Sequence, residues 1–354
     1  YLESTNKVFN ETYRSFSKYL KLNFEKRTGL SNEEKEALIF LYAYMPLSDW
    51  ADYSEEFYID NVKASFLARN ELKWVRNIPE QIYRHFVLPI RVNNENLDTS
   101  RIVFYKELKK RVENLSMYEA ALEVNHWCHE KVTYRGSDAR TSSPLCTMKK
   151  AIGRCGEEST FTVAAMRAVG IPARQCYTPR WAHSDDNHAW VEVWVDGKWY
   201  FLGACEPEPE LNLGWFAAPV KRAMMVNTTV FGDYSGSEEI LNKGTKFTKI
   251  NLLANYAPVK TIFIKTTNNK NVPLKDITVE FQLYNYAEFY PIAIKKTNID
   301  GIASLTTGFG DLLIWVYDNK GFFNFKKISV ENSDTVSLVI DNKNIFDTVY
   351  NFDI

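Results

Sequence analysis

Two side chains with complementary chemistry open two different segments of this sequence. Cys155 lies in the run Gly-Arg-Cys-Gly-Glu-Glu-Ser at 153–159 and begins an apolar segment of helical character that ends at Gly170. His188 begins the segment 188–195, whose alternation is typical of a strand. A helix N-terminus lowers the pKa of a thiol, and a neighbouring imidazole completes an ion pair. These positions predict a Cys–His nucleophile pair, with a small buried thiol as the alternative.

Composition and charge exclude several classes of partner. The chain has 354 residues, of which 45% are apolar, and this length predicts two or three domains with sizeable cores. Its 43 basic and 44 acidic residues leave a formal charge of −1, with no basic stripe. Nucleic acid is therefore not an expected partner. No apolar run approaches the roughly 18 residues of a membrane-spanning helix, so no membrane span is expected.

The five cysteines all lie within residues 128–205, and their odd number leaves at least one free thiol. This is not the pattern of a disulfide scaffold. Cys128, Cys146 and Cys176 offer one disulfide to an exported protein, and the sequence does not say which pair would form it. Four possible metal ligands also share one predicted helix, namely His126, Cys128, His129 and Glu130. No second ligand pair accompanies them, so packing is favoured over zinc, and no metal or other cofactor is expected.

Periodicity divides the chain into three parts and predicts an α+β protein. Residues 1–115 carry apolar positions at three- and four-residue steps, which predict a helical N-terminal region. Ser31 and Glu34 form a capped start for its second helix. Residues 116–248 contain the Cys and His segments and mix helix with strand. Residues 249–354 hold short alternating runs between Asn, Asp and Gly turns, which predict a C-terminal β-sandwich.

The order of elements in the central part is specific. A helix is expected over about 155–169, a strand over 173–177 and a turn-rich loop over 178–187. The strand that begins at His188 ends at Asp196-Gly197, a dipeptide typical of a tight hairpin, and its partner runs over 198–202. His188 is therefore expected at the end of the strand that is far from the turn.

Four motifs give this core a resemblance to the transglutaminase-like superfamily, a branch of the papain-like cysteine enzymes. They are Gly-Arg-Cys-Gly-Glu-Glu at 153–158, Met-Arg-Ala-Val-Gly-Ile-Pro-Ala-Arg at 166–174, Asn-His-Ala-Trp-Val-Glu-Val at 187–193 and Asp-Gly-Lys-Trp at 196–199. The resemblance covers about 127–215. It implies a papain-like core with an antiparallel sheet and a Cys-His-Asp triad that acts on carboxamides through a thioester. Cys155 would be the nucleophile and His188 the base.

The C-terminal strands are similar, more weakly, to the immunoglobulin-like or carboxypeptidase-regulatory-like modules that are often appended to secreted enzymes. That likeness implies a bacterial protein that is secreted or held at the cell surface.

The acid that orients the imidazole departs from the family's pattern. In the family it follows a tryptophan by four positions, whereas here Trp199 leads to Gly203. Glu206, three residues further on, is the first substitute for a group that stabilises the imidazolium. Asp185, Asp186 or no carboxylate at all are the alternatives.

Hairpin register bears on this substitution, because side chains alternate between the faces of a sheet. A two-residue loop would pair Val195 with Lys198 and place Cys205 opposite His188, so that Glu206 would point to the other face. A three-residue loop with a bulge would bring Glu206 to the face of His188. Pairing that ends before Cys205 would let the following loop swing Glu206 in.

Other side chains are candidates for the oxyanion and for substrate. Trp127 matches the family's upstream tryptophan, whose indole N–H can donate to the oxyanion, with plain packing as the alternative. Arg180 and Trp181 precede His188 in a loop expected at the rim of the site, and Trp215 is a similar candidate.

Glu157 and Glu158 follow the thiol within one helical turn. Their charges would raise its pKa, so at least one is expected to turn away into a hydrogen bond or a salt bridge, with Arg154 or Arg174 as partner.

These expectations describe a cysteine-dependent amide hydrolase or acyl transferase that acts on a protein, peptide or glycopeptide carboxamide. Hydrolysis is favoured over crosslinking by analogy, because the chain shows no recognisable calcium sites or activation segment of the animal transglutaminases. The alternative is a catalytically silent module that binds a glycan or peptide at a cell surface, and Gly203 at the position of the acid is its main support.

Overall fold

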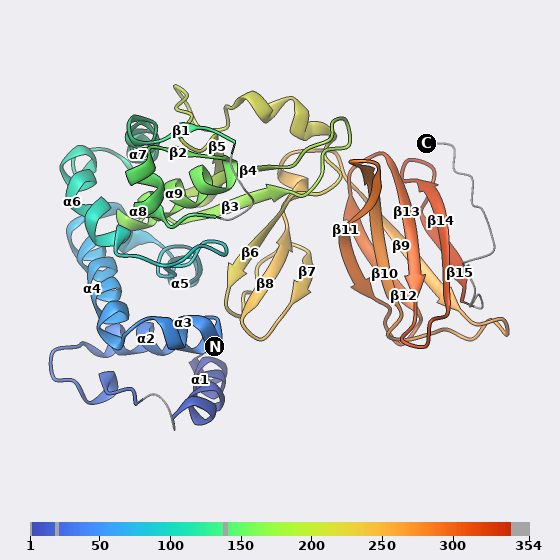
Figure 1. Ribbon diagram of the computed structural model, residues 1–354, viewed down its shortest axis with the longest axis horizontal. Coiled ribbons are helices and arrows are strands. Elements are labelled where there is room, and N and C mark those ends of the chain that lie inside the picture. The colour runs from blue at the N-terminus through green and yellow to red at the C-terminus, as the bar shows by residue number, and fades with distance from the viewer. Residues whose placement is uncertain (1, 18–20, 137–140, 341–354) are drawn as a thin grey trace.

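The computed structural model describes residues 2–17, 21–136 and 141–340 and confirms the α+β class. Helices gather at one end of the molecule, a six-stranded sheet occupies the middle, and two smaller sheets form the other end (Figure 1). Among the described residues, no helix combines the length and the apolar character that crossing a membrane requires.

The N-terminal part consists of helices α1 (Leu2–Phe16), α2 (Asn32–Tyr44), α3 (Leu47–Asp52), α4 (Glu55–Glu71), α5 (Glu80–Phe86) and α6 (Ser100–Val112), with 3₁₀ turns at Phe24–Lys26 and Lys73–Asn77. The predicted cap of α2 is present. The Glu34 N–H donates to Ser31 Oγ at 3.1 Å, and the Ser31 N–H donates to the Glu34 carboxylate at 2.7 Å. Helix α7 (Met117–Lys131) begins with the same capping box at Ser116.

One hydrophobic core joins these helices to the helix that carries the thiol. Helix α9 (Cys155–Ala168) follows α8 (Pro144–Lys150) and is buried at every position after Cys155. Phe161 of α9 stacks on Trp127 of α7 with ring centroids 5.5 Å apart, and it meets Phe104 of α6 edge-on. A helix that is buried all round needs neighbours on every side. The N-terminal helices therefore hold α9 in place.

An antiparallel sheet forms the other wall of the core. Its strands are β3 (Ala173–Thr178), β4 (His188–Val195), β5 (Lys198–Leu202), β6 (Asn227–Phe231), β7 (Ile240–Lys243) and β8 (Phe247–Asn251), in the spatial order β5-β4-β3-β6-β8-β7. Val195 pairs with Lys198, which is the register of the two-residue hairpin. Strands β6 to β8 lie beyond the elements expected from the sequence, and β8 crosses the boundary expected after residue 248. The short strands β1 (Thr133–Tyr134) and β2 (Ile152–Gly153) pair in parallel just before Cys155.

The C-terminal part is a sandwich of two sheets with its own hydrophobic core. One sheet has the order β11-β10-β13-β14 and the other β12-β9-β15. The strands are β9 (Lys260–Thr267), β10 (Thr278–Asn285), β11 (Glu288–Lys296), β12 (Ile302–Thr307), β13 (Asp311–Tyr317), β14 (Phe323–Ser329) and β15 (Thr335–Val339).

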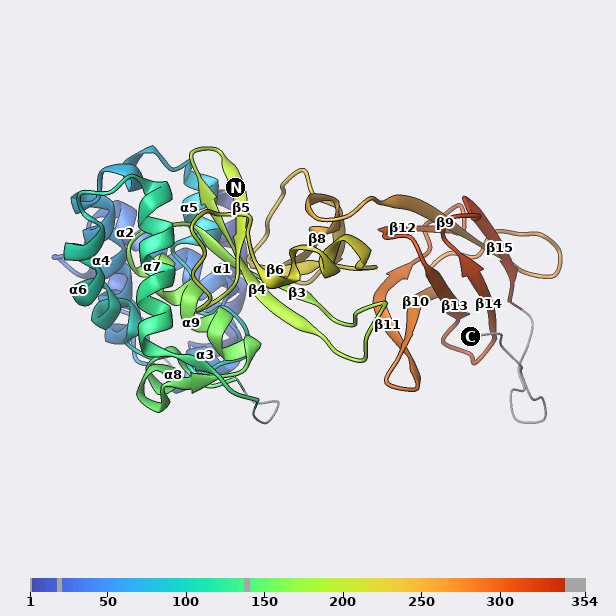
Figure 2. The same cartoon turned by 90° about the horizontal axis from the view of Figure 1, so that it is seen from above.

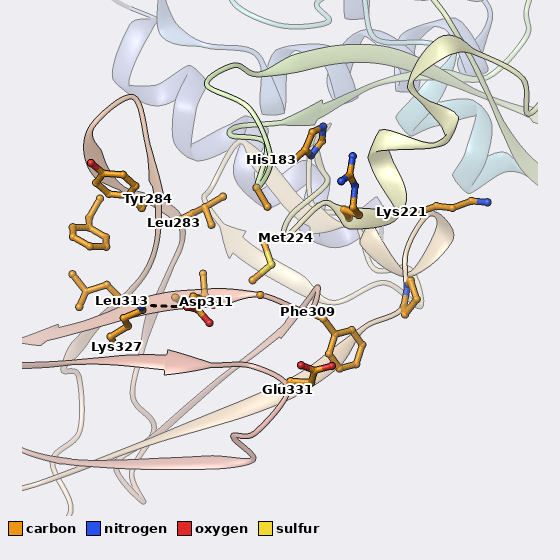
Figure 3. A pocket seen from close by; sticks show the side chains of 16 residues that line it. His183, Lys221, Met224, Leu283, Tyr284, Phe309, Asp311, Leu313, Lys327 and Glu331 are labelled. Atoms are coloured by element: carbon orange, nitrogen blue, oxygen red, sulfur yellow. Dashed lines mark ion pairs between the residues drawn. The ribbon is translucent and has the colours of Figure 1, made fainter. Parts of the chain in front are cut away.

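The sandwich touches the core at the loop between β3 and β4, which reaches towards β11 (Figure 2). Asn285 Nδ2 donates to the carbonyl oxygens of Trp181 at 2.9 Å and Ser184 at 2.8 Å, and the Tyr286 N–H donates to Asp185 at 2.8 Å. Beside this contact lies a cavity of about 680 Å³, with His183 on its core side and the Asp311–Lys327 ion pair on its sandwich side (Figure 3). Cys155 does not line this cavity.

Candidate active site

The start of α9 fixes the position of the thiol. The Glu157 carboxylate accepts a hydrogen bond from the Arg154 N–H at 3.1 Å and forms an ion pair with the Arg154 guanidinium. A Cβ at Gly156 would lie 2.3 Å from Arg154 Nη1, and one at Gly153 would lie 2.8 Å from the Glu157 Cβ. Close packing thus favours glycine at 153, whereas a side chain at 156 would only displace the end of the flexible Arg154 side chain. The prediction that one glutamate turns away is confirmed for Glu157.

Burial raises the pKa of the Cys155 thiol above its usual value. The Ala189 N–H, which hydrogen-bonds the sulfur, and the Arg154 charge both act in the opposite direction, while Asp186 and Glu158 add to the rise. The sequence-based expectation was a lowered pKa from the helix N-terminus. The helix N-terminus is present, but desolvation of the thiolate is the larger effect here. At neutral pH the free site therefore holds a thiol.

His188 lies in a cage of aromatic rings. Its ring centroid is 4.7 Å from that of Trp215, 5.2 Å from Phe216, 5.7 Å from Trp190 and 6.3 Å from Trp181. This apolar surrounding lowers the pKa of His188 to about 4, because the imidazolium loses its hydration. Nε2 is buried and has no hydrogen-bond partner among the described residues. The imidazole is therefore neutral at pH 7 and has an unused nitrogen.

Cys155 and His188 line one cavity of about 320 Å³. Glu206, Trp181 and Trp215 line it as well, so the structure brings together five of the side chains selected from the sequence. A second cavity, of about 510 Å³, lies on the other side of Cys155 and is walled by strands β3, β6 and β8. Cys155 thus borders two cavities.

Glu206 occupies the space that a side chain at position 203 would need. A Cβ added to Gly203 would lie 2.3 Å from Glu206 Oε2. Pairing of β5 ends at Leu202, and the chain turns back so that Gly203 and Glu206 form an isolated bridge. The hairpin therefore has the two-residue register, but its pairing ends before Cys205. The loop that follows carries Glu206 inward, to the cavity that His188 lines.

Asn125 of α7 holds this loop, and sequence reasoning did not find it. Its Nδ2 donates to the carbonyl oxygens of Gly203 at 2.9 Å and Glu206 at 3.1 Å, and its Oδ1 accepts from the Cys205 N–H at 3.0 Å. Asn125 is 1% exposed. A polar residue within the buried face of a predicted helix was the signal that could have found it.

Three carboxyl groups, those of Glu158, Asp186 and Glu206, share the cavity with the thiol. Burial raises the pKa of Glu158 to about 8, and the charges of Glu206 and Glu157 add to the rise. Burial also raises the pKa of Glu206, against a hydrogen bond from Trp215. Glu158 is therefore largely protonated at pH 7.

Trp127 and Arg180 lie elsewhere. The Trp127 indole N–H donates to Glu107 at 3.1 Å, and Trp127 lines neither cavity at Cys155, so it packs and does not face an oxyanion. Arg180 turns to the sandwich, where it lies 3.9 Å above the Tyr290 ring and pairs with Glu288 at 3.4 Å.

The remaining acidic and basic candidates are also placed. Asp186 lines the His188 cavity, whereas Asp185 accepts from the sandwich backbone. Arg174 pairs with Glu192 and Glu238 and is no partner of the glutamates after Cys155.

The proposed metal ligands and disulfide partners have ordinary surroundings. His129 Nδ1 contacts the Cys205 carbonyl oxygen at 3.0 Å, and Glu130 pairs with Arg111. Within the described ranges, no group of three or more His, Cys, Asp or Glu side chains is arranged to hold a metal ion. All five cysteines are free thiols.

Comparisons with known proteins agree with this geometry. Residues 106–204 match the model of the transglutaminase-like superfamily. Among solved structures, a candidate cysteine protease from Cytophaga hutchinsonii is 20% identical with a TM-score of 0.31, covering 51% of this chain and 66% of that one. Red sea bream transglutaminase is 9% identical with a TM-score of 0.31, covering 66% and 58%. No curated protein matches in sequence. The family-model match thus identifies a transglutaminase-like domain at residues 106–204, and both Cys155 and His188 lie within it.

Proposed function

We propose that this chain is a cysteine-dependent amide hydrolase or acyl transferase, with Cys155 as nucleophile, His188 as base and Glu206 as the acid behind it. The observation that carries the proposal is the placement of Glu206, whose carboxylate fills the space above Gly203 in the cavity that Cys155 and His188 share. In this proposal the acid stands three positions further along the chain than in the family's pattern.

The proposed reaction has two halves. The Cys155 sulfur attacks the amide carbonyl carbon while its proton passes to His188, and first-turn N–H groups of α9 stabilise the oxyanion. His188 then protonates the leaving amine as the C–N bond breaks, which leaves a thioester. Water attacks the thioester with His188 again as base and releases the acid and the thiol. An amine in place of water would give acyl transfer.

Because the resting His188 imidazole is neutral, the proposed role of Glu206 is to stabilise the imidazolium that forms during the reaction. His188 carries a positive charge only during the reaction, in an apolar cage that disfavours it. A nearby carboxylate offsets this cost, as the acid of a triad does. Trp215, whose ring lies against His188 and whose N–H bonds to Glu206, links the two groups.

The substrate we propose is a protein, peptide or glycopeptide carboxamide, and hydrolysis is the favoured outcome. Trp215 is 58% exposed at the mouth of the cavity and is the residue placed to contact the substrate. We also propose that the sandwich is an immunoglobulin-like module of a secreted or surface enzyme, since it packs on the loop that walls the site.

A catalytically silent binding module is the second candidate. The raised pKa of the Cys155 thiol favours it, because a resting thiolate would be the stronger sign of an active cysteine. In that case the cavity would hold a glycan or peptide without turnover.

Profiling a peptide and glycopeptide library for released ammonia or amine separates the two. Active wild-type protein and inactive Cys155→Ala and Cys155→Ser variants of unchanged thermal stability would support the enzyme. Binding of library members without turnover by wild type would support the silent module.

A further inference from the structure

The cavity on the strand side of Cys155 has a chemical character of its own. The side chains of Gln175 and Tyr177 on β3, Asn227 and Thr229 on β6 and Lys249 on β8 share one face of the sheet, because Tyr177 is paired with Asn227 and Thr229 with Lys249. Directly paired residues point to the same side, as do residues two apart. All of them line the cavity of about 510 Å³.

This polar face packs against the start of α9. Gln175 Nε2 donates to Ser159 Oγ at 2.7 Å and to the Gly156 carbonyl oxygen at 3.3 Å, both within the first turn and a half of the helix. The opposite face of the same strands carries buried apolar groups, among them Cys176, Val230 and Ile250. The polar face is therefore the one that continues from the thiol into the cavity.

Two groups in this cavity lack the partners that such groups normally have. Asn227 is 3% exposed, and its Nδ2 has no hydrogen-bond partner among the described residues. A buried donor without a partner is unfavourable, so this amide favours a ligand that brings an acceptor. The Lys249 ammonium group makes no ion pair or hydrogen bond with a described residue, and partial burial lowers its pKa. No Asp or Glu of the described ranges lines the cavity, although Arg154 does.

We propose that this cavity is a subsite for a carboxylate of the substrate, which the Lys249 ammonium and the Asn227 amide bind while Cys155 attacks the carboxamide. A carboxylate supplies what both groups lack, a negative charge and acceptor oxygens. The inference rests on the proposed function and narrows its substrates to carboxamides that also carry an acid.

The first test needs no turnover. The melting temperature of wild type and of Cys155→Ala is measured with succinate and with its neutral analogue succinamide. We expect that succinate raises the melting temperature and that succinamide does not. The dissociation constant for succinate should be about tenfold higher in Lys249→Gln, which loses a charged hydrogen bond, and in Asn227→Asp, whose carboxylate repels the ligand. The control variant is Lys265→Gln, at an exposed position of strand β9. It removes the same charge as Lys249→Gln, but far from the cavity, and should leave succinate binding unchanged. Equal effects of the two ligands, or an undiminished effect in Lys249→Gln, would overturn the subsite.

The second test uses the thiol. Cys155 is alkylated either with iodoacetate, which is anionic, or with iodoacetamide, which is neutral. Peptide mapping measures the rate of each reaction. Lys249→Gln should lower the iodoacetate rate about tenfold relative to the iodoacetamide rate. A parallel fall of both rates would count against the subsite. The melting test measures binding and needs no active Cys155. A protein that binds succinate but shows no turnover would therefore contradict the proposed function and still support the carboxylate subsite.

Turnover then distinguishes two sources of the carboxylate. One peptide carries glutamine followed by glutamate with an amidated C-terminus, and the other ends in glutamine with a free C-terminus. A KM that rises in Lys249→Gln for either peptide, and not for its neutral analogue, supports the subsite and identifies the source. No charge-selective change for either peptide contradicts it.

Discussion

Gly203 and Glu206 act as a pair at the scale of single residues, because the carboxylate of one occupies the space that a side chain on the other would require. Under the proposed function, this exchange would account for a glycine at the position where the family's pattern has an acid, while Glu206 lines the cavity. It also explains why sequence spacing alone left the acid open. A glycine and a glutamate three positions apart acquire their meaning only when the chain turns back between them.

The exchange can be reversed by mutation. Glu206→Ala should lower kcat/KM by about 10²- to 10⁴-fold, the range for loss of acid–base assistance. Gly203→Asp alone should destabilise the protein, since its Cβ would lie 2.3 Å from Glu206 Oε2. Alanine at position 206 would remove the Oε2 contact but keep its Cβ, which lies 2.9 Å from a Cβ at position 203. The double variant Gly203→Asp/Glu206→Gly removes both contacts and should recover activity relative to Glu206→Ala. Steady-state kinetics beside thermal melting make the comparison, and a double variant no better than Glu206→Ala would exclude the exchange.

The charge state of the free site is a second prediction at this scale. Burial raises the pKa of Cys155, so the thiol keeps its proton to higher pH than usual. The rate of iodoacetamide labelling should therefore rise with pH through a midpoint above the ordinary value of about 8.5. His188 is neutral above about pH 4, so His188→Ala should leave this midpoint in place. A midpoint below pH 7 that moves upward in His188→Ala would instead reveal a resting thiolate–imidazolium ion pair.

Secondary-structure elements bring these residues together, and some of them were readable in advance. The glycine-flanked start of α9, the strand that begins at His188 and the Asp196-Gly197 hairpin follow from local chemistry, and all three are present. Strands β6 to β8 were missed because they are short and partly polar, and because β6 joins β3 through the single pair Tyr177 and Asn227. Contacts between residues far apart in the chain, such as Asn125 with the loop at 203–206, leave no local pattern.

Asn125 of helix α7 is expected to stabilise the loop at 203–206, which carries Glu206. Asn125→Ala removes three hydrogen bonds to the loop and leaves its backbone groups buried. The free energy of unfolding should fall by about 2–4 kcal/mol, since each buried group without a partner costs about 1–3 kcal/mol. Urea denaturation measures this fall. Asn125→Asp keeps the size of the side chain but turns a carboxylate oxygen towards the two carbonyl oxygens, so it should lose at least as much. A loss in Asn125→Ala with none in Asn125→Asp would show that the side chain matters only for packing.

The whole molecule couples the sandwich to the site through the loop of Trp181. Because Asn285 binds two carbonyl oxygens of this loop, the sandwich helps to hold one wall of the His188 cage. The composition of residues 249–354 predicted the sandwich, but it held no information about this contact. Interfaces between distant segments depend on shape, and shape appears only in three dimensions.

Loosening this contact should be visible locally. Asn285→Ala should speed amide hydrogen exchange in residues 181–187 about five- to thirtyfold, since up to two hydrogen bonds of about 1 kcal/mol each are lost. Exchange in β13 serves as the internal control and should not change. Unaltered exchange in 181–187 would mean that the loop is held by the core alone.

The most direct test of the central claim is to trap the acyl-enzyme. Wild-type protein is mixed with a substrate found by library profiling, quenched in acid within the first turnover and weighed by intact-protein and peptide mass spectrometry. The account predicts an increment equal to the substrate's acyl group on the Cys155 peptide, absent in Cys155→Ala and slow to form in His188→Ala. Turnover that persists in Cys155→Ala, or an acyl group on any other residue, would contradict it.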